Sequence, residues 1–288
     1  MVSAAPFIRL MTAWLCVPAA VVFSLLLSLP GRAAVIPAGS DLAGNDNTIT
    51  YLVYGAAAEP YQILNPAGQN HPSTGFISDV VRAVFADTPY RLREEVKPIR
   101  RAKRDMLNGL TTHWIAYALR SWAAEGVWGN ATFADVDLLD YQLSLMARDG
   151  TPVPSPQRMR AQGVVWIQGY SYPGTDEFAS RHGLQFLRAT DHRSAVRMVM
   201  GGRAGYFMEE SSRIVYALTN LGEDLAAYRF YPLNDEVPPT KITLLMSNDL
   251  GPGVQGFINR RLRQLQQDGT LQQLAGRYQL QGAVPPTP

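Results

Sequence analysis

Hydrophobic and polar positions after residue 47 form two successive series of strands and helices. Residues 48–54 (TITYLVY) are rich in β-branched and aromatic side chains, which predicts a buried strand. Apolar residues recur at helical spacing over 76–85 and predict a helix with one apolar face. The other elements predicted in this series are strands at 90–96 and 114–119 and a helix at 99–107. This alternating order is typical of a parallel sheet with crossover helices.

The pattern restarts around a stretch rich in structure-breaking residues, 148–156 (RDGTPVPSP). The elements predicted around and after it are strands at 141–147, 164–168, 185–189, 204–208 and 241–247, and helices at 175–182 and 191–200. Two late helices are predicted around 254–265 and 271–278. The restart favours two α/β lobes over one long sheet. The chain would cross between them near 140–150 and 238–246, and the late helices would return to the first lobe.

The amino-terminal residues have the pattern of an export signal. An apolar run at 10–29 precedes Gly31 and Ala33, small residues of the kind a signal peptidase needs, so we expect cleavage after Ala33. The alternative is an uncleaved membrane anchor, because the run approaches the length that spans a bilayer. Cleavage would remove the single cysteine, Cys16, so the mature chain could form no disulfide.

These patterns give a predicted division of the whole chain. We expect a signal peptide at 1–33 and a flexible leader at 34–47. The first lobe would comprise 48–142 and 243–280, and the second lobe 143–242. Residues 281–288 would form a disordered tail.

Charge and motif content exclude several function classes. Lysine and arginine number 26 against 24 acidic residues, so no basic surplus points to nucleic acid. The four histidines are far apart, and no phosphate-binding loop, dinucleotide fingerprint or nucleophile elbow occurs. We therefore expect no metal or cofactor. Adjacent Glu209 and Glu210 would face opposite sides of a strand, so they are not a ready acid–base pair.

Six short motifs, in this order, resemble the bacterial extracellular solute-binding proteins of family 3. They are Pro60-Tyr61, GFISDV (75–80), PIRR (98–101), GVVWIQGYSY (163–172), MVMGGRAG (198–205) and NRRLRQLQQDGT (259–270). The resemblance covers roughly residues 48–280. It implies the type II periplasmic binding protein fold, with two α/β lobes that each contain a mostly parallel sheet. It also implies capture of a small polar molecule between the lobes.

The sequence departs from the amino-acid binders of that family at the ligand clamp. The segment at 120–126 (RSWAAEG) lacks the arginine that clamps a ligand carboxylate, although Arg120 could substitute from nearby. Glu210 falls where the family's second-lobe acid grips an ammonium group. A standard α-amino acid ligand is therefore not predicted, while a ligand bearing an amine stays open.

The resemblance and the aromatic residues beside turns give six candidate ligand-binding residues. Tyr61 and Trp122 would stack on the ligand, and Arg100 and Arg120 would meet its anionic groups. Tyr172 and Glu210 would contribute from the second lobe.

The predicted function is that of a periplasmic solute-binding protein that serves an ABC-type membrane transporter permease or a sensor. We expect neither a nucleic-acid partner nor an enzymatic activity. One alternative is a dehydratase or lyase on the same fold, for which only Glu59 or Glu210 could supply a cleft acid with a raised pKa. Another is a ligand-sensing subunit of a signalling system, which an uncleaved anchor at 10–29 would favour.

Overall fold

The computed structural model describes residues 47–55, 58–65, 67, 71–125, 129–170, 174–280 and 282. The predicted signal segment, nearly all of the leader and most of the predicted tail lie outside these residues. Within the described part, no helix combines the length and apolar character needed to cross a bilayer.

The first sheet has parallel and antiparallel strand pairs. Its strands, in spatial order, are β2 (Arg91–Val96), β1 (Thr48–Val53), β3 (Trp114–Leu119), β11 (Thr240–Ser247) and β4 (Ala131–Phe133), with β5 (Leu139–Tyr141) also paired to β11. β1 is parallel to β2 and β3, as the alternating order predicts, whereas β11 is antiparallel to its neighbours. All six residues of β3 are buried, which fits a strand in the middle of a covered sheet.

The second sheet repeats this arrangement with a different set of strands. Its order is β10 (Tyr228–Pro232), β6 (Leu143–Arg148), β9 (Tyr206–Glu210), β7 (Val164–Ile167) and β8 (Leu187–Ala189). β7 runs parallel to β8 and β9, while β6 is antiparallel to β9 and β10. β9 lies two residues later than predicted, so both Glu209 and Glu210 belong to it.

The chain passes twice from one sheet to the other. The first passage is at Gln142, between β5 and β6, and the second lies between β10 and β11. The prediction of a single strand at 141–147 is wrong in this respect, because Tyr141 pairs in the first sheet and Leu143 in the second. Alternation along a sequence reports extended backbone, and it carries no information about which partner each half pairs with.

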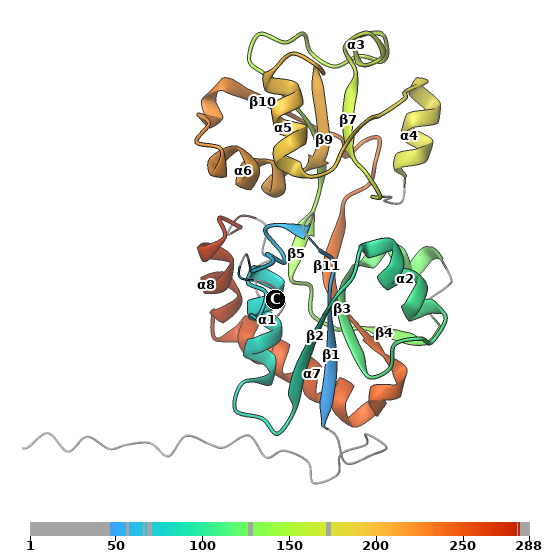
Figure 1. Ribbon diagram of the computed structural model, residues 1–288, viewed down its shortest axis with the longest axis vertical. Helices are drawn as coiled ribbons and strands as arrows, with labels where there is room; N and C mark the ends of the chain where they lie inside the picture. The colour runs from blue at the N-terminus through green and yellow to red at the C-terminus, as the bar shows by residue number, and fades with distance from the viewer. Residues whose placement is uncertain are drawn as a thin grey trace, which may run out of the picture. The chain divides into compact units, whose positions relative to one another are not determined.

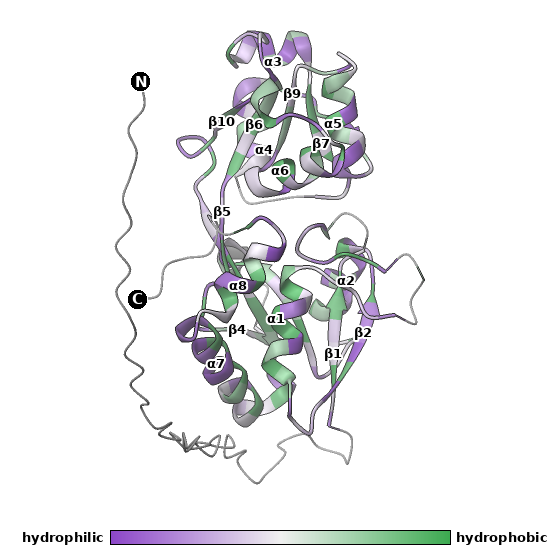
Figure 2. Ribbon diagram, turned by 90° about the vertical axis from the view of Figure 1, so that its left-hand side faces the viewer, coloured by the Kyte–Doolittle hydropathy of each residue, from purple (hydrophilic) through white to green (hydrophobic). Residues whose placement is uncertain are grey.

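Helices cover the first sheet from two parts of the sequence. They are α1 (Phe76–Phe85), α2 (Ile99–Leu107), α7 (Gly251–Gln267) and α8 (Thr270–Arg277), with 3₁₀ turns at Arg120–Glu125 and Asn248–Leu250. α1, α7 and α8 pack against one another; in Figure 1, α1 and α8 lie to the left, and α7 crosses the lower end of the sheet. α1 is rich in hydrophobic residues and α7 in hydrophilic ones (Figure 2). This difference fits their burial, since seven of the ten α1 residues but only five of the seventeen α7 residues are buried.

The second sheet is accompanied by α3 (Pro156–Gln162), α4 (Thr175–His182), α5 (His192–Met200) and α6 (Ser211–Asn220), and by a 3₁₀ turn at Leu225–Ala227. α5 packs against α6 and against four strands of the sheet, β6, β7, β8 and β9. Neither α3 nor α6 is among the helices predicted from the sequence. Pro156 begins α3, where proline is favourable, with Ser155 as the cap. α6 is capped by Glu210, which is not among the usual capping residues.

Candidate functional site

Hydrogen bonds join groups around the first sheet to groups around the second, and three of them define the candidate site. The Tyr61 hydroxyl donates to Glu210 Oε2 (2.9 Å), and Arg213 Nε donates to the Glu59 carbonyl oxygen (3.1 Å). Arg100 Nε donates to the carbonyl oxygen of Gly169 (3.3 Å). We call the six residues that make these bonds the seam. They follow β1 and β7, end β9 or lie in the first turns of α2 and α6. This agrees with the rule that α/β sheets bind ligands beyond the carboxyl ends of their strands.

Arg213 lies at the centre of the seam, between two aromatic rings. Its guanidinium carbon is 5.0 Å from the centre of the Tyr61 ring and 5.1 Å from that of Tyr170, both within cation–π range. Arg213 Nη2 also donates to the Tyr170 hydroxyl (2.9 Å), and the residue is only 1% exposed. The protein's own guanidinium group therefore occupies an aromatic sandwich of the kind that could hold a ligand cation.

Glu209 is the buried counter-ion of Arg213. Its Oε1 atom lies 3.7 Å from Arg213 Nη1 and accepts a hydrogen bond from the Tyr141 hydroxyl (3.2 Å). Its Oε2 atom lies 3.0 Å from His192 Nε2. Burial alone would raise the pKa of the Glu209 carboxyl, but Arg213 and His192 hold that pKa below its ordinary value. Glu209 is thus ionised and accepts a hydrogen bond from His192, whose Nε2 atom carries the hydrogen.

His192 adds a pH-sensitive group to this buried cluster. Burial lowers its pKa below the ordinary value of 6.5, and the charge of Arg213 lowers it further. The bond to Glu209 and the charges of Glu209 and Asp191 oppose this shift without outweighing it. The folded protein therefore holds His192 in its neutral form at pH values where an unfolded chain would protonate it.

We expect the free energy of unfolding to fall more steeply with decreasing pH in the wild type than in a His192→Gln variant. Below about pH 6.5 the unfolded chain binds a proton that the folded protein excludes, so acid favours unfolding. The slopes should differ by up to about 1.4 kcal/mol per pH unit. Urea unfolding at several pH values between 5 and 8 measures both slopes. Equal slopes would contradict the interpretation, and exposed His71→Gln controls for the loss of a histidine.

Glu210, the last residue of β9, caps α6. Its carboxylate accepts hydrogen bonds from the Ser212 amide and hydroxyl, the Arg213 amide and the Tyr61 hydroxyl. Burial raises its pKa, although the bonds from Ser212, Tyr61 and Arg213 oppose that shift. Four donors already converge on this carboxylate, so it is committed to the cap and to the seam.

Aromatic packing fixes the ring of Tyr61 from the first-lobe side. The Tyr61 and Tyr117 rings meet edge to face with their centres 5.9 Å apart, and Tyr54 meets Tyr117 at 4.8 Å. The Tyr54 hydroxyl donates to the Tyr117 carbonyl oxygen (2.9 Å). All three side chains are buried, so the Tyr61 hydroxyl is held in place to meet Glu210.

The structure brings some of the six predicted site residues together and leaves others apart. Tyr61 and Glu210 touch, and Arg100 reaches the second lobe. Arg120 instead bonds to Asp137 and to the Ala134 carbonyl oxygen. Trp122 is buried beneath the ammonium group of Lys103, which lies 5.2 Å from its ring centre. Tyr172 lies outside the described residues.

Arg213 and His192 were not predicted as site residues, although both contact the buried Glu209. Arg213 sits on the unpredicted helix α6, whose signal is Ile214, Ala217 and Leu218 at helical spacing. His192 follows the cap of α5, where a lone histidine has no distinguishing pattern. Neither burial nor the pairing with Glu209 can be seen in the sequence.

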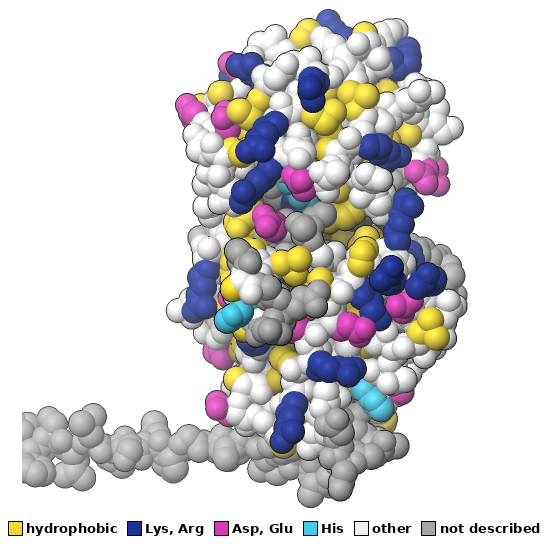
Figure 3. Space-filling view, in the orientation of Figure 1, with side chains coloured by type: hydrophobic (Ala, Val, Ile, Leu, Met, Phe, Trp, Pro, Cys, Tyr) yellow, Lys and Arg dark blue, Asp and Glu magenta, His cyan; other side chains and the backbone are white. Residues whose placement is uncertain are grey.

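A cavity of about 330 Å³ adjoins the seam. It is lined by Glu59 from the first lobe and by residues of α5 and α6, including Arg193, Arg197 and Arg213. Figure 3 shows basic side chains beside acidic ones and a histidine on the face that carries these two helices. The cavity volume lies near the lower end of the range for small-molecule sites.

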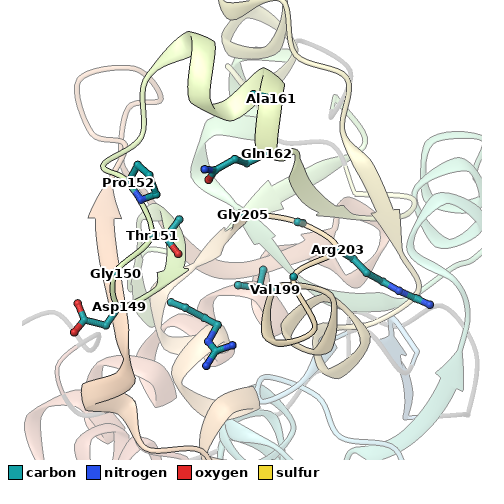
Figure 4. Close-up of a pocket in the computed structure, with 12 residues that line it drawn as sticks. Asp149, Gly150, Thr151, Pro152, Ala161, Gln162, Val199, Arg203 and Gly205 are labelled. Atoms are coloured by element: carbon teal, nitrogen blue, oxygen red, sulfur yellow. The ribbon is translucent and has the colours of Figure 1, made fainter.

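A larger cavity of about 680 Å³ lies away from the seam. It is lined by the end of β6, the turn after it, the end of α3 and the segment 202–205. In Figure 4, Gln162 points toward Pro152, whereas Arg203 extends away from the other labelled residues. No described residue of the first sheet lines this cavity, so closure between the lobes would not enclose a ligand there.

Comparison with known proteins shows the fold but not the family. No protein-family model matches the sequence, and no curated protein matches it. Solved structures do match. A histidine-bound substrate-binding protein of an ABC uptake transporter from Streptococcus pneumoniae aligns with a TM-score of 0.63 at 14% identity, over 81% of this chain and 92% of that one. The fold is that of the type II periplasmic binding proteins. This confirms the fold that the family 3 resemblance implies.

Two further structures with this fold come from different biological settings. One was solved for work on glutathione import via GshT and the cystine ABC importer TcyBC of Streptococcus mutans. It aligns with a TM-score of 0.67 at 17% identity, over 84% of this chain and 98% of that one. The other is a histidine kinase sensor domain with similarity to periplasmic binding proteins. Its TM-score is 0.62 at 14% identity, over 84% of this chain and 99% of that one. The periplasmic binding fold is therefore shared by transport proteins and sensors.

Proposed function

We propose that the protein is a solute-binding protein that captures a small polar molecule between its two lobes. The observation that carries the proposal is the seam, where aromatic and charged side chains of both lobes meet beside a cavity. A ligand enclosed there would contact both lobes at once, so binding and lobe closure would favour each other. Enclosure would also strengthen each polar contact, because water is excluded.

We also propose that the protein is exported and delivers its ligand to an ABC-type transporter. Support comes from the signal-like residues 1–33 and from the likeness to substrate-binding proteins of ABC transporters. Amino-terminal sequencing of the protein recovered from the cell envelope tests the first part. A chain that begins at Ala34 or nearby agrees with it, and a chain that retains residues 10–29 argues for an anchor.

A thermal-shift screen against a metabolite library tests the binding function itself. A compound that binds only the folded protein raises its midpoint of thermal unfolding, by an amount that grows with ligand concentration. We expect at least one small polar compound to do so in a saturable way. A library in which no compound raises the midpoint would contradict the proposal.

The seam bond provides a sharper prediction. Tyr61→Phe should weaken binding of a compound from that screen about three- to tenfold, because the closed form loses a hydrogen bond between the lobes while the ring packing remains. Isothermal titration calorimetry measures the change. Tyr228→Phe is a matched control, since the Tyr228 hydroxyl donates to Glu223 (2.7 Å) within the second lobe. Equal losses of ligand affinity in the two variants would show that the bond between Tyr61 and Glu210 does not contribute to binding.

A sensory role is a second candidate, because a histidine kinase sensor domain aligns as well as the transport proteins do. In that case ligand-driven closure would be reported to a signalling partner instead of a permease. Deleting the gene would then alter a transcriptional response to the ligand without lowering its uptake. Loss of uptake alone would identify the transport role.

A lyase role has one observation in its favour. Burial raises the pKa of Glu59 and of Glu210, which is the property a cleft acid needs. Glu210 is committed to four donors, so Glu59 would have to do the chemistry. Incubating the purified protein with prephenate-like substrates tests this: product formation that Glu59→Gln abolishes would favour the enzyme.

A further inference from the structure

The cavity beside the seam presents an unusual concentration of arginine. Arg193 and Arg197 on α5 and Arg213 on α6 line it, against the carboxyl groups of Glu59 and Asp191. Arg193 and Arg197 lie four residues apart, so they share one face of the helix, and both are exposed. The lining therefore has more positive than negative groups.

Arg193 does not help α5 to fold, whereas Arg197 lies in the last turn, where the helix dipole favours a cation. Arg193 lies in the first turn of α5, where the helix dipole disfavours a cation, and like charges four residues apart repel each other. Among the described residues, no carboxylate lies within 4 Å of either guanidinium group to form an ion pair. A residue such as Arg193, which costs helix stability without a local benefit, is expected at a functional site.

The nearby carboxylates are engaged in other ways. Asp191 caps α5 and accepts bonds from the Ser194 amide (2.7 Å), the Ser194 hydroxyl (3.1 Å) and the Thr190 hydroxyl (2.9 Å). Glu209 pairs with Arg213 and His192 behind the cavity wall. Glu59 is the remaining acid of the lining. Burial raises the pKa of its carboxyl and outweighs the charge of Arg193, which lowers that pKa. Among the described residues, no carboxylate forms an ion pair with Arg197.

The place that a ligand cation would take is already filled. The guanidinium group of Arg213 occupies the sandwich between Tyr61 and Tyr170, and Glu209 neutralises it. Glu210, which would otherwise grip an ammonium group, caps α6 and accepts the Tyr61 hydroxyl. A cationic ligand would have to displace a buried ion pair, which is costly.

We propose that the cavity between α5 and α6 binds a small anionic molecule through a carboxylate or phosphate group held by Arg193 and Arg197. This inference rests on the proposed binding function and names its ligand class. Arginine pairs with such oxyanions through two parallel hydrogen bonds, which gives both affinity and orientation. Tyr216, half-buried in the lining, adds an aromatic surface for the body of the ligand.

Calorimetric titration at low ionic strength tests the ligand class. The probes are succinate and inorganic phosphate as anions, L-arginine as a cation and glucose as a neutral molecule, together with the compounds of the library screen grouped by charge. We expect binding by an anion and weaker binding as salt is added. Arg193→Gln and Arg197→Gln should each weaken it at least tenfold. Arg260→Gln, on exposed α7 surface, is the control and should leave it unchanged.

The possible outcomes separate this inference from the proposed function. Binding of cationic or neutral compounds, with none by anions, would overturn the anionic class and leave the binding function standing. Anion binding that both arginine variants preserve would overturn the assignment to this cavity. Failure of every probe and every library compound would contradict both. Succinate binding without phosphate binding, or the reverse, decides between the carboxylate and phosphate forms of the proposal.

Discussion

Replacing Arg213 by methionine should lower the free energy of unfolding by about 3–5 kcal/mol. The substitution keeps most of the apolar stem but removes the charge that neutralises Glu209, whose side chain is fully buried. It also removes the donors to the Tyr170 hydroxyl and the Glu59 carbonyl oxygen. A buried carboxylate that loses its cation must either stay charged at high cost or take up a proton, and either route favours the unfolded chain.

A double-mutant cycle separates the ion pair from the packing around it. Glu209→Gln in the Arg213→Met background should recover part of the loss, because the orphaned charge is then gone. Arg229→Met is the matched control, since the ion pair of Arg229 with Asp149 (2.8 Å) is more than half exposed and should contribute little to stability. Urea unfolding gives all the values. A loss at Arg213 no larger than that at Arg229 would show that the cluster does not hold the lobe together.

Most elements of this fold could be predicted because their patterns are local. The helix at Ile99–Leu107 and the strand at Trp114–Leu119 have the predicted bounds, since periodicity and an adjoining Asn-Gly stop mark them. Strand pairing was harder. Extended residues around Gln142 look continuous in sequence, yet they belong to two sheets, because pairing is decided by distant strands.

The candidate site was predictable only in part, for the same reason. Tyr61 and Glu210 were selected from motifs and turn positions, and the structure places them in contact, while their role in ligand binding stays a prediction. Arg213 could not be selected, because an arginine on a helix is usually solvated, and only tertiary packing shows that this one is buried. Arg120 illustrates the converse case, a residue that the sequence suggests for the site but that the structure uses elsewhere. Its guanidinium group pairs with Asp137 of the same lobe.

Gly75, which opens the GFISDV motif, lies so close to the backbone of Tyr61 that no side chain fits at position 75. Gly75 has a φ of 107°, a conformation that side chains other than glycine rarely adopt. A Cβ atom there would lie 2.6 Å from the Tyr61 carbonyl oxygen and 2.9 Å from the Gln62 Cα. Both contacts are with backbone, so no side chain can turn aside. The amide of Ile77 bonds to the same Tyr61 carbonyl (2.9 Å) and ties α1 to this segment.

Gly75→Ala should therefore lower the free energy of unfolding by about 2–6 kcal/mol, the sum of backbone strain and overpacking. Gly109→Ala is the matched control: it has a φ of 66° but nothing within 4 Å of a Cβ atom, so strain alone should cost about 1–2 kcal/mol. Urea unfolding compares the two. The alanine at 75 should also weaken ligand binding, because relief of the overlap displaces the Tyr61 backbone and moves its hydroxyl away from Glu210. Equal losses of stability, with unchanged binding, would mean that the close approach to Tyr61 constrains neither the fold nor the seam.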